Sequence, residues 1–110
     1  MKGDDLYLRH IHQAVEKIEK YTKEISFDAF RQDDMRFDAV VRELEIIGEA
    51  AGKISENFRE VHAEIPWSKM LGMRNRLIHE YFGVDDDIVW RTCTEDLPPL
   101  RSILHSILEE

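Results

Sequence analysis

Apolar side chains recur every three or four residues along most of the chain, which is the spacing of amphipathic helices rather than of strands. The first stripe predicts a helix from about Asp4 to Lys23, with Asp4 or Asp5 as its N-cap. The positions of this stripe are Leu8, Ile11, Val15, Ile18, Thr22 and Ile25. The first fifth of the chain therefore predicts one long helix with a single buried face.

A second long helix is predicted to open near Asp33 or Asp34 and to run to about residue 54, after a connection over 26–31 in which Ser26 can cap one turn. Two glycines within it, Gly48 and Gly52, each cost about 1 kcal/mol relative to alanine. Their spacing predicts close approach of a neighbouring helix. A phosphate-binding loop is disfavoured because no strand precedes these glycines.

The remainder predicts further helices separated by turns. Residues 57–65 are irregular or one short helical turn, and Pro66 fits the first turn of a third helix that Gly83 ends or follows. Its apolar side contains Trp67, Met70, Leu71, Leu77 and Ile78. Asp85 or Asp86 caps a fourth helix. Pro98 and Pro99 must either kink that helix or begin a fifth one. We expect an all-α bundle of four or five helices, in one domain spanning residues 1–110.

Composition agrees with a folded helical protein, because 43% of residues are apolar and 35% are charged. No apolar run near the N-terminus is long enough for a signal peptide or a membrane span, so we expect a cytoplasmic protein that does not enter membranes. The single cysteine, Cys93, cannot form an internal disulfide. We expect it to pack in the core.

The net charge of -8 argues against a general nucleic-acid binder, whose affinity comes from many Lys and Arg side chains on phosphates. A dimer would carry twice that charge. Any RNA would therefore have to be held in a local cationic cleft, and an acidic surface would suit a basic protein partner.

The segment with the clearest chemistry reads MRNRLIHEYFGVDDDIVW, over 73–90. It places Arg74, Asn75, His79 and Tyr81 within one apolar-periodic stretch. Arginine is a permanent planar cation that suits phosphate oxygens, and histidine exchanges a proton near neutral pH. An R-x4-H pair thus supplies the two parts that phosphodiester cleavage needs without a metal.

This segment resembles the HepT-like group of the HEPN superfamily. The resemblance covers nearly the whole chain, because the IIGEAA run over 46–51, the Ile-Pro-Trp turn over 65–67 and Leu97-Pro98 follow that group's pattern in the same order. It implies a small, dimeric, all-helical HEPN-like bundle that acts as a metal-independent ribonuclease toxin without a cofactor. It also implies a partner, an MNT-type nucleotidyltransferase antitoxin, and an RNA substrate such as a tRNA or an mRNA.

Carried over residue by residue, the family's R-x4-H-x-Y motif falls on Arg74, His79 and Tyr81, with Asn75 as the polar residue after the arginine. In that family the partner enzyme can attach AMP to the tyrosine, which silences the nuclease, so the resemblance implies that Tyr81 is the AMP acceptor. Tyr81 fits a substrate contact better than a base, because a phenol ionises far above neutral pH.

The chemistry expected of the site is attack of a ribose 2′-OH on the neighbouring phosphorus. His79 would move a proton, and Arg74 would stabilise the charge that builds on the phosphoryl oxygens. Asn75 would hydrogen-bond the phosphate or orient the imidazole, and Arg76 would hold a flanking phosphate. A metal site is disfavoured because His10 and His12, two residues apart on a helix, point about 200° apart.

Two alternatives remain open. The chain could be a non-catalytic subunit that binds a nucleotide or substrate for a nucleotidyltransferase, or a scaffold whose polar motif only sets dimer geometry. The spacing of the motif is relevant to whether a dimer forms the cleft. Arg74 and His79 lie about 140° apart on a regular helix, so one straight helix cannot direct both side chains at one phosphate. Either the helix unwinds near His79 or a second copy of the motif completes the cleft, and the resemblance favours the second arrangement.

Overall fold

The computed structural model describes residues 2–79 and 84–109, in which every regular element is helical. The longer helices are α1 (Lys2–Thr22), α3 (Asp34–Lys53), α5 (Trp67–His79) and α7 (Leu97–Glu109). The shorter ones are α2 (Phe27–Gln32), α4 (Glu56–Val61) and α6 (Asp86–Arg91), and a π-helical turn, η2 (Thr92–Asp96), joins α6 to α7. The all-α prediction is confirmed, with more short helical segments than the four or five helices expected.

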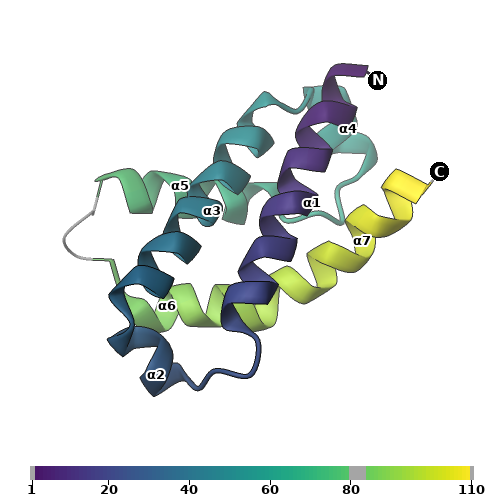
Figure 1. Cartoon of the computed structure of the whole chain (residues 1–110). Helices are drawn as coiled ribbons and strands as arrows, with labels where there is room; N and C mark the ends of the chain where they lie inside the picture. Colours follow the sequence, from purple (N-terminus) through teal and green to yellow (C-terminus); the bar gives the residue numbers. More distant parts are fainter. Residues whose placement is uncertain (1, 80–83, 110) are drawn as a thin grey trace.

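The helices α1 and α3 lie side by side and run in opposite directions (Figure 1). At one end, the Asp4 carboxylate accepts hydrogen bonds from the Ser55 backbone N–H at 2.8 Å and from its hydroxyl at 2.7 Å. At the other end, the Arg36 guanidinium donates to the Tyr21 carbonyl. The prediction of Asp4 or Asp5 as an N-cap is wrong, because α1 begins at Lys2 and the buried Asp4 instead ties α1 to the end of α3.

The other three predicted caps are confirmed. Ser26, Asp33 and Asp85 accept backbone N–H groups in the first turns of α2, α3 and α6, at 3.1, 3.1 and 2.9 Å. The backbone and side-chain bonds from Arg36 also lower the pKa of the Asp33 carboxyl. Short polar side chains before an apolar run therefore located these helix starts from sequence alone.

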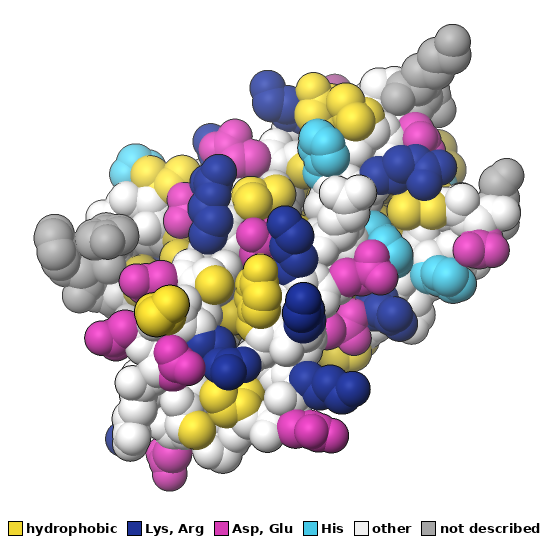
Figure 2. All heavy atoms as spheres, viewed as in Figure 1, with side chains coloured by type: hydrophobic (Ala, Val, Ile, Leu, Met, Phe, Trp, Pro, Cys, Tyr) yellow, Lys and Arg dark blue, Asp and Glu magenta, His cyan; other side chains and the backbone are white. Residues whose placement is uncertain are grey.

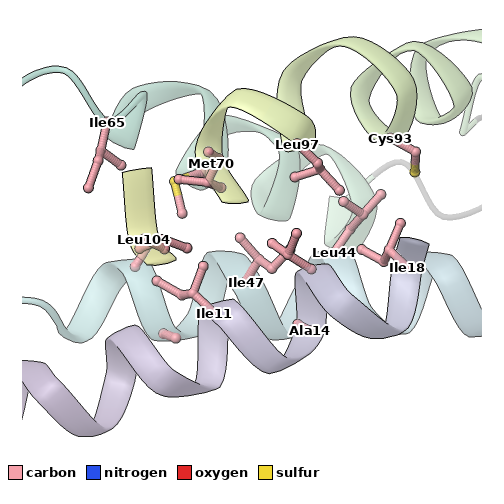
Figure 3. Close-up of a cluster of buried hydrophobic side chains, with 14 of the residues drawn as sticks. Ile11, Ala14, Ile18, Leu44, Ile47, Ile65, Met70, Cys93, Leu97 and Leu104 are labelled. Atoms are coloured by element: carbon pink, nitrogen blue, oxygen red, sulfur yellow. The ribbon is translucent and has the colours of Figure 1, made fainter. Parts of the chain in front are cut away.

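One apolar core connects the four longer helices, and Figure 3 shows part of it. Its members from these helices include Leu8, Ile11, Val15, Ile18, Val40, Leu44, Ile47, Met70, Leu77, Leu97, Leu100 and Leu104. Cys93 is buried in the same cluster, and burial raises the pKa of its thiol to about 12. The thiol is therefore uncharged at neutral pH, which confirms the expected packing role.

The proline pair coincides with a change in helix geometry. Pro98 and Pro99 have no N–H to offer the carbonyls four residues earlier, and their rings would crowd those carbonyls in a regular α-helix. The chain widens into the π turn, where the Leu97 N–H bonds to the Thr92 carbonyl five residues back. Sequence predicted a kink or a new helix here, and the new helix is confirmed, because α7 begins at Leu97, directly before Pro98, and follows the π turn without a break. Within the two described ranges, no helix is long and apolar enough to cross a membrane.

Candidate active site

Helix α5 is fixed at its beginning and exposed at its end. Trp67 and Met70 are buried, and the Trp67 indole N–H donates to the His62 carbonyl at 3.1 Å. Pro66 directly precedes the helix, and its carbonyl accepts the Met70 N–H at 3.2 Å, which agrees within one residue with its predicted first-turn position. In the last turns only Leu77 is buried. The polar motif therefore lies on a helix anchored at one end and open at the other.

Arg74 lies against α3 with its side chain one-third exposed. Its Nε donates to Oε1 of Glu49 at 3.0 Å, in a contact between residues 25 positions apart. Because a guanidinium carries five donors in a planar fork, this bond leaves the terminal nitrogens for other acceptors. The Glu49 carboxylate thus fixes the direction of Arg74 without using all of its hydrogen-bonding capacity.

Gly48 makes this arrangement possible. A Cβ at position 48 would overlap the Arg74 Cβ, and would lie 2.9 Å from the Arg74 Cγ and 3.1 Å from the Met70 carbonyl oxygen. One turn further, a Cβ at Gly52 would meet the Leu71 side chain at an ordinary 3.5 Å. The predicted close approach of a neighbouring helix is confirmed, and the partner is the helix that carries the motif.

Asn75 and His79 lie on the exposed side of α5. They are about 40° apart in helical projection, so they share one strip of surface. Neither side chain makes a hydrogen bond or an ion pair with another residue of the described ranges. The exposed strip thus carries an amide and an imidazole directed toward solvent.

Because α5 remains helical through His79, Arg74 and His79 keep the angle of about 140° between them. The helix is therefore not unwound between Arg74 and His79. Unwinding just beyond His79, where Gly83 was expected to help, falls outside the described residues and stays a prediction. Arg76 lies on a third side of α5, at the edge of a pocket, and is exposed. Tyr81 and Gly83, the other motif positions singled out from sequence, lie outside the described residues.

The charge around the motif is mixed, as the sequence indicated. Arg74 is paired with Glu49, and Arg91 is paired with Asp87 at 3.0 Å. On the face of the molecule in Figure 2, which α1 and α3 form, Lys and Arg side chains are interspersed with Asp and Glu. RNA held at the motif would therefore depend on a few directed contacts rather than on a broad basic surface.

The histidines outside the motif have structural neighbours. His10 contacts the ring of Tyr7, while His12 lies 3.3 Å from a Glu16 carboxylate oxygen and stacks with His105. Among residues 2–79 and 84–109, no group of three or more His, Cys, Asp or Glu side chains is arranged to hold a metal ion.

The glycine spacing predicts the close helix contact at Gly48, but it does not indicate that this contact positions Arg74. The sequence assigns no role to Glu49, the direct neighbour of Gly48, which pairs with Arg74. The position of Glu49 next to Gly48 was the signal that could have indicated its role. A residue adjacent to a glycine at a close helix contact lies near the residues that this glycine contacts. The pairing of Glu49 with Arg74 itself required the helix crossing to be known.

The protein is thus a small α-helical bundle with a polar site on one of its helices. The site comprises an arginine, an amide and a histidine near the exposed end of that helix. The family model described as Ribonuclease HepT-like matches residues 11–107. The chain therefore belongs to the HepT-like ribonuclease family, as its sequence pattern predicted.

Individual relatives agree. The chain is 50% identical over 95 residues, 86% of each chain, to a Thermococcus cleftensis protein named Probable ribonuclease HepT. It is 44% identical over 110 residues, 100% of this chain and 98% of the relative, to a Putative RNase of Caldanaerobacter subterraneus subsp. tengcongensis. A Methanocaldococcus jannaschii protein named Gamma-glutamylcyclotransferase and putative RNase is 42% identical over 109 residues, 99% of this chain and 49% of its own length. These names support a ribonuclease function. No solved structure matches the chain.

Proposed function

We propose that this protein is a metal-independent endoribonuclease that acts as the toxin of a toxin–antitoxin pair and cleaves RNA with Arg74 and His79. The observation that carries the proposal is the arrangement at the end of α5. A cation held by Glu49 and an exposed imidazole without a partner among the described residues lie on one short stretch of helix. Membership of the HepT-like family supports the same chemistry.

In the proposed reaction the ribose 2′-OH attacks the adjacent phosphorus while the bond to the 5′-oxygen of the next nucleotide breaks. His79 either accepts the 2′-OH proton while water protonates the leaving 5′-oxygen, or protonates that oxygen while water takes the 2′-OH proton. The products are a cyclic phosphate and a 5′-OH. Arg74 stabilises the added negative charge on the phosphoryl oxygens. Asn75 contacts the phosphate or the imidazole, and Arg76 contacts a flanking phosphate.

The proposed active form is a homodimer with its cleft at the two-fold axis. On the continuous helix α5, one chain directs Arg74 toward α3 and His79 away from it, so a single phosphate cannot meet both side chains squarely. A second copy of α5 crossing the first would bring Arg74 of one chain toward His79 of the other. The geometry supports a shared cleft. The proposed place of action of the protein is the cytoplasm, where RNA substrates are present.

Control is proposed to act through Tyr81, two positions after His79. AMP on its hydroxyl would add negative charge and bulk beside the motif, which repels RNA phosphate. Co-expression with an MNT-type nucleotidyltransferase should add whole AMP units to the peptide that contains Tyr81. Neutralised toxicity without such mass additions would mean that the antitoxin inhibits by binding.

The nuclease proposal is tested with purified protein and total RNA in the presence of EDTA. Wild-type protein should cleave, and His79→Ala should lose about 10²- to 10⁴-fold of the rate, the usual contribution of a positioned acid or base. His10→Ala, which removes another exposed histidine, is the matched control and should cleave normally. Cleavage that requires added Mg²⁺, or that survives in His79→Ala, would refute the scheme.

A further inference from the structure

A pocket of about 350 Å³ opens between α5, α3 and the α6–η2–α7 segment. Its apolar lining comes from Leu44, Ile47, Met70, Met73, Leu97 and Leu100. Figure 3 shows four of these, Leu44, Ile47, Met70 and Leu97, gathered from three separate elements. The volume lies within the usual range for small-molecule sites, which is about 300–1,000 Å³.

Polar side chains also line this pocket. Lys69 is exposed and Asp96 is partly exposed, and their Nζ and Oδ1 atoms lie 4.0 Å apart. Thr92 donates its hydroxyl to the Ile88 carbonyl at 2.8 Å and keeps its oxygen lone pairs as acceptors. Cationic, anionic and hydroxyl groups around an apolar interior are typical of a site that orients a ligand, whereas a packing defect would have hydrocarbon walls.

We propose that this pocket binds one base of the RNA, adjacent to the phosphate that is cleaved. The inference rests on the proposed nuclease function and names a substrate contact that the R-x4-H-x-Y motif does not contain. The base inserts between Met70 and Met73, and the ribose-phosphate passes along the outside of α5 toward His79.

The position of the pocket on α5 supports this path. Met73 and Arg76 belong to its lining, and they flank Arg74 and Asn75 in sequence. Arg76 and His79 are three residues apart, so they are neighbours on the helix surface, less than one turn of about 5.4 Å apart along the axis. The pocket edge and the proposed acid-base group are therefore within reach of one nucleotide and its phosphate.

The chemistry of the lining indicates which base fits best. Thioether sulfur makes favourable contacts with aromatic rings, and methionine adapts its shape to a flat ligand. The Asp96 carboxylate accepts from ring or amino N–H groups, while the Lys69 ammonium donates to a carbonyl oxygen. Guanine offers two adjacent N–H donors beside a carbonyl, so it matches this pair better than uracil does.

The π turn explains why the site is present in this chain. Thr92, Asp96 and Leu97 all belong to the turn or directly follow it, and each lines the pocket. A regular α-helix through this segment would rotate these side chains relative to one another. π-Helical turns occur frequently at functional sites, and this one follows from the proline pair.

The proposal is tested by titrating protein labelled with ¹³C at its methionine methyl groups with the four nucleoside 3′-monophosphates. Guanosine monophosphate should shift the Met70 and Met73 signals saturably, with a Kd of about 1 mM, and uridine monophosphate should bind more weakly. Met35, which is 85% exposed at the start of α3, is the internal control and should not move.

Two variants locate the binding. Gly72 lines the pocket, and a Cβ at this position would meet no atom within 4 Å, so Gly72→Leu should fold, extend over the opening and weaken binding at least tenfold. Gly3→Leu, at an equally open helical glycine on α1, is the matched control and should bind as wild type. Sedimentation of both variants checks that their oligomeric state is unchanged.

The base pocket is refuted if Met70 and Met73 show no saturable shift, if ribose 5-phosphate shifts them equally, or if Gly72→Leu binds like wild type. These measurements need no RNA cleavage. A protein that binds guanosine monophosphate here supports the pocket even if it cleaves no RNA, whereas cleavage without any methyl shift refutes the pocket alone.

Discussion

Helix α3 packs on two neighbours in different ways. Toward α1, whose buried face is mostly large apolar side chains, the contact is closed at its ends by the Asp4–Ser55 and Arg36–Tyr21 hydrogen bonds. Toward α5, the contact is made over Gly48 and includes the half-exposed Glu49–Arg74 pair. The first contact contributes stability and contains no candidate chemistry. The second has a glycine in place of a side chain at position 48, which leaves room for Arg74, the proposed catalytic arginine. Substitutions in the α1 contact should therefore change stability alone, whereas substitutions in the α5 contact that displace Arg74 should change RNA cleavage.

The largest effect on stability is expected in the α1 contact. Ile11 is fully buried, so Ile11→Ala should lower the free energy of unfolding by about 2–5 kcal/mol through lost burial and a residual cavity. The fraction that stays folded should cleave RNA at the wild-type rate. Leu6→Ala, at a half-exposed position of the same helix, should change stability by less than about 0.5 kcal/mol. Denaturant unfolding measures both, and equal effects would contradict the assignment of the core.

The two glycines of α3 provide a matched pair for the α5 contact. Gly48→Ala should cost about 1–3 kcal/mol by overpacking and should reduce RNA cleavage at least tenfold, because the new methyl group displaces Arg74. Gly52→Ala meets only an ordinary contact, so it should gain up to about 1 kcal/mol from helix propensity and leave cleavage unchanged. Melting curves and cleavage rates check both variants. The comparison fails if Gly48→Ala is as benign as Gly52→Ala.

A smaller effect, confined to activity, is expected at Glu49. Glu49→Gln removes the charge that orients Arg74 and should slow RNA cleavage about tenfold, equivalent to about 1.4 kcal/mol in the barrier. The melting temperature should change little, because a half-exposed ion pair contributes about 0–1 kcal/mol. Asp5→Asn breaks an exposed pair with Arg9 and is the control. A cleavage rate unaffected by Glu49→Gln would remove Glu49 from the site.

Local signals predicted most of the fold. Ser26, Asp33 and Asp85 were recognisable as caps because a short polar side chain satisfies the first N–H groups of a helix within a few residues of sequence. The α1 start was misplaced for the opposite reason. Asp4 resembles a cap, but its carboxylate is used by Ser55, 51 residues away. The π turn was also missed, because prolines indicate that a regular helix is interrupted but do not specify the geometry of the interruption.

The sequence indicated which residues belong to the candidate site, but not which residues hold Arg74 in place. Arg74, Asn75 and His79 follow from motif spacing, and the glycine spacing of α3 predicted a close helix contact. Three features depend on how α3 and α5 cross. The glycine contact falls on Arg74, Glu49 pairs with Arg74, and Arg76 borders a pocket. Crossing is set by packing between distant segments, which one-dimensional periodicity does not encode.

In the proposed shared cleft, Arg74 and His79 act on one phosphate from different chains. Arg74→Ala and His79→Ala subunits, each inactive alone, can be mixed under conditions that exchange dimer partners and then assayed for RNA cleavage. Half of a random mixture is mixed dimer with one intact site of two, so the activity recovered should be about one quarter of wild type. A mixture as inactive as its components, or a folded monomer with full activity, would contradict the shared cleft.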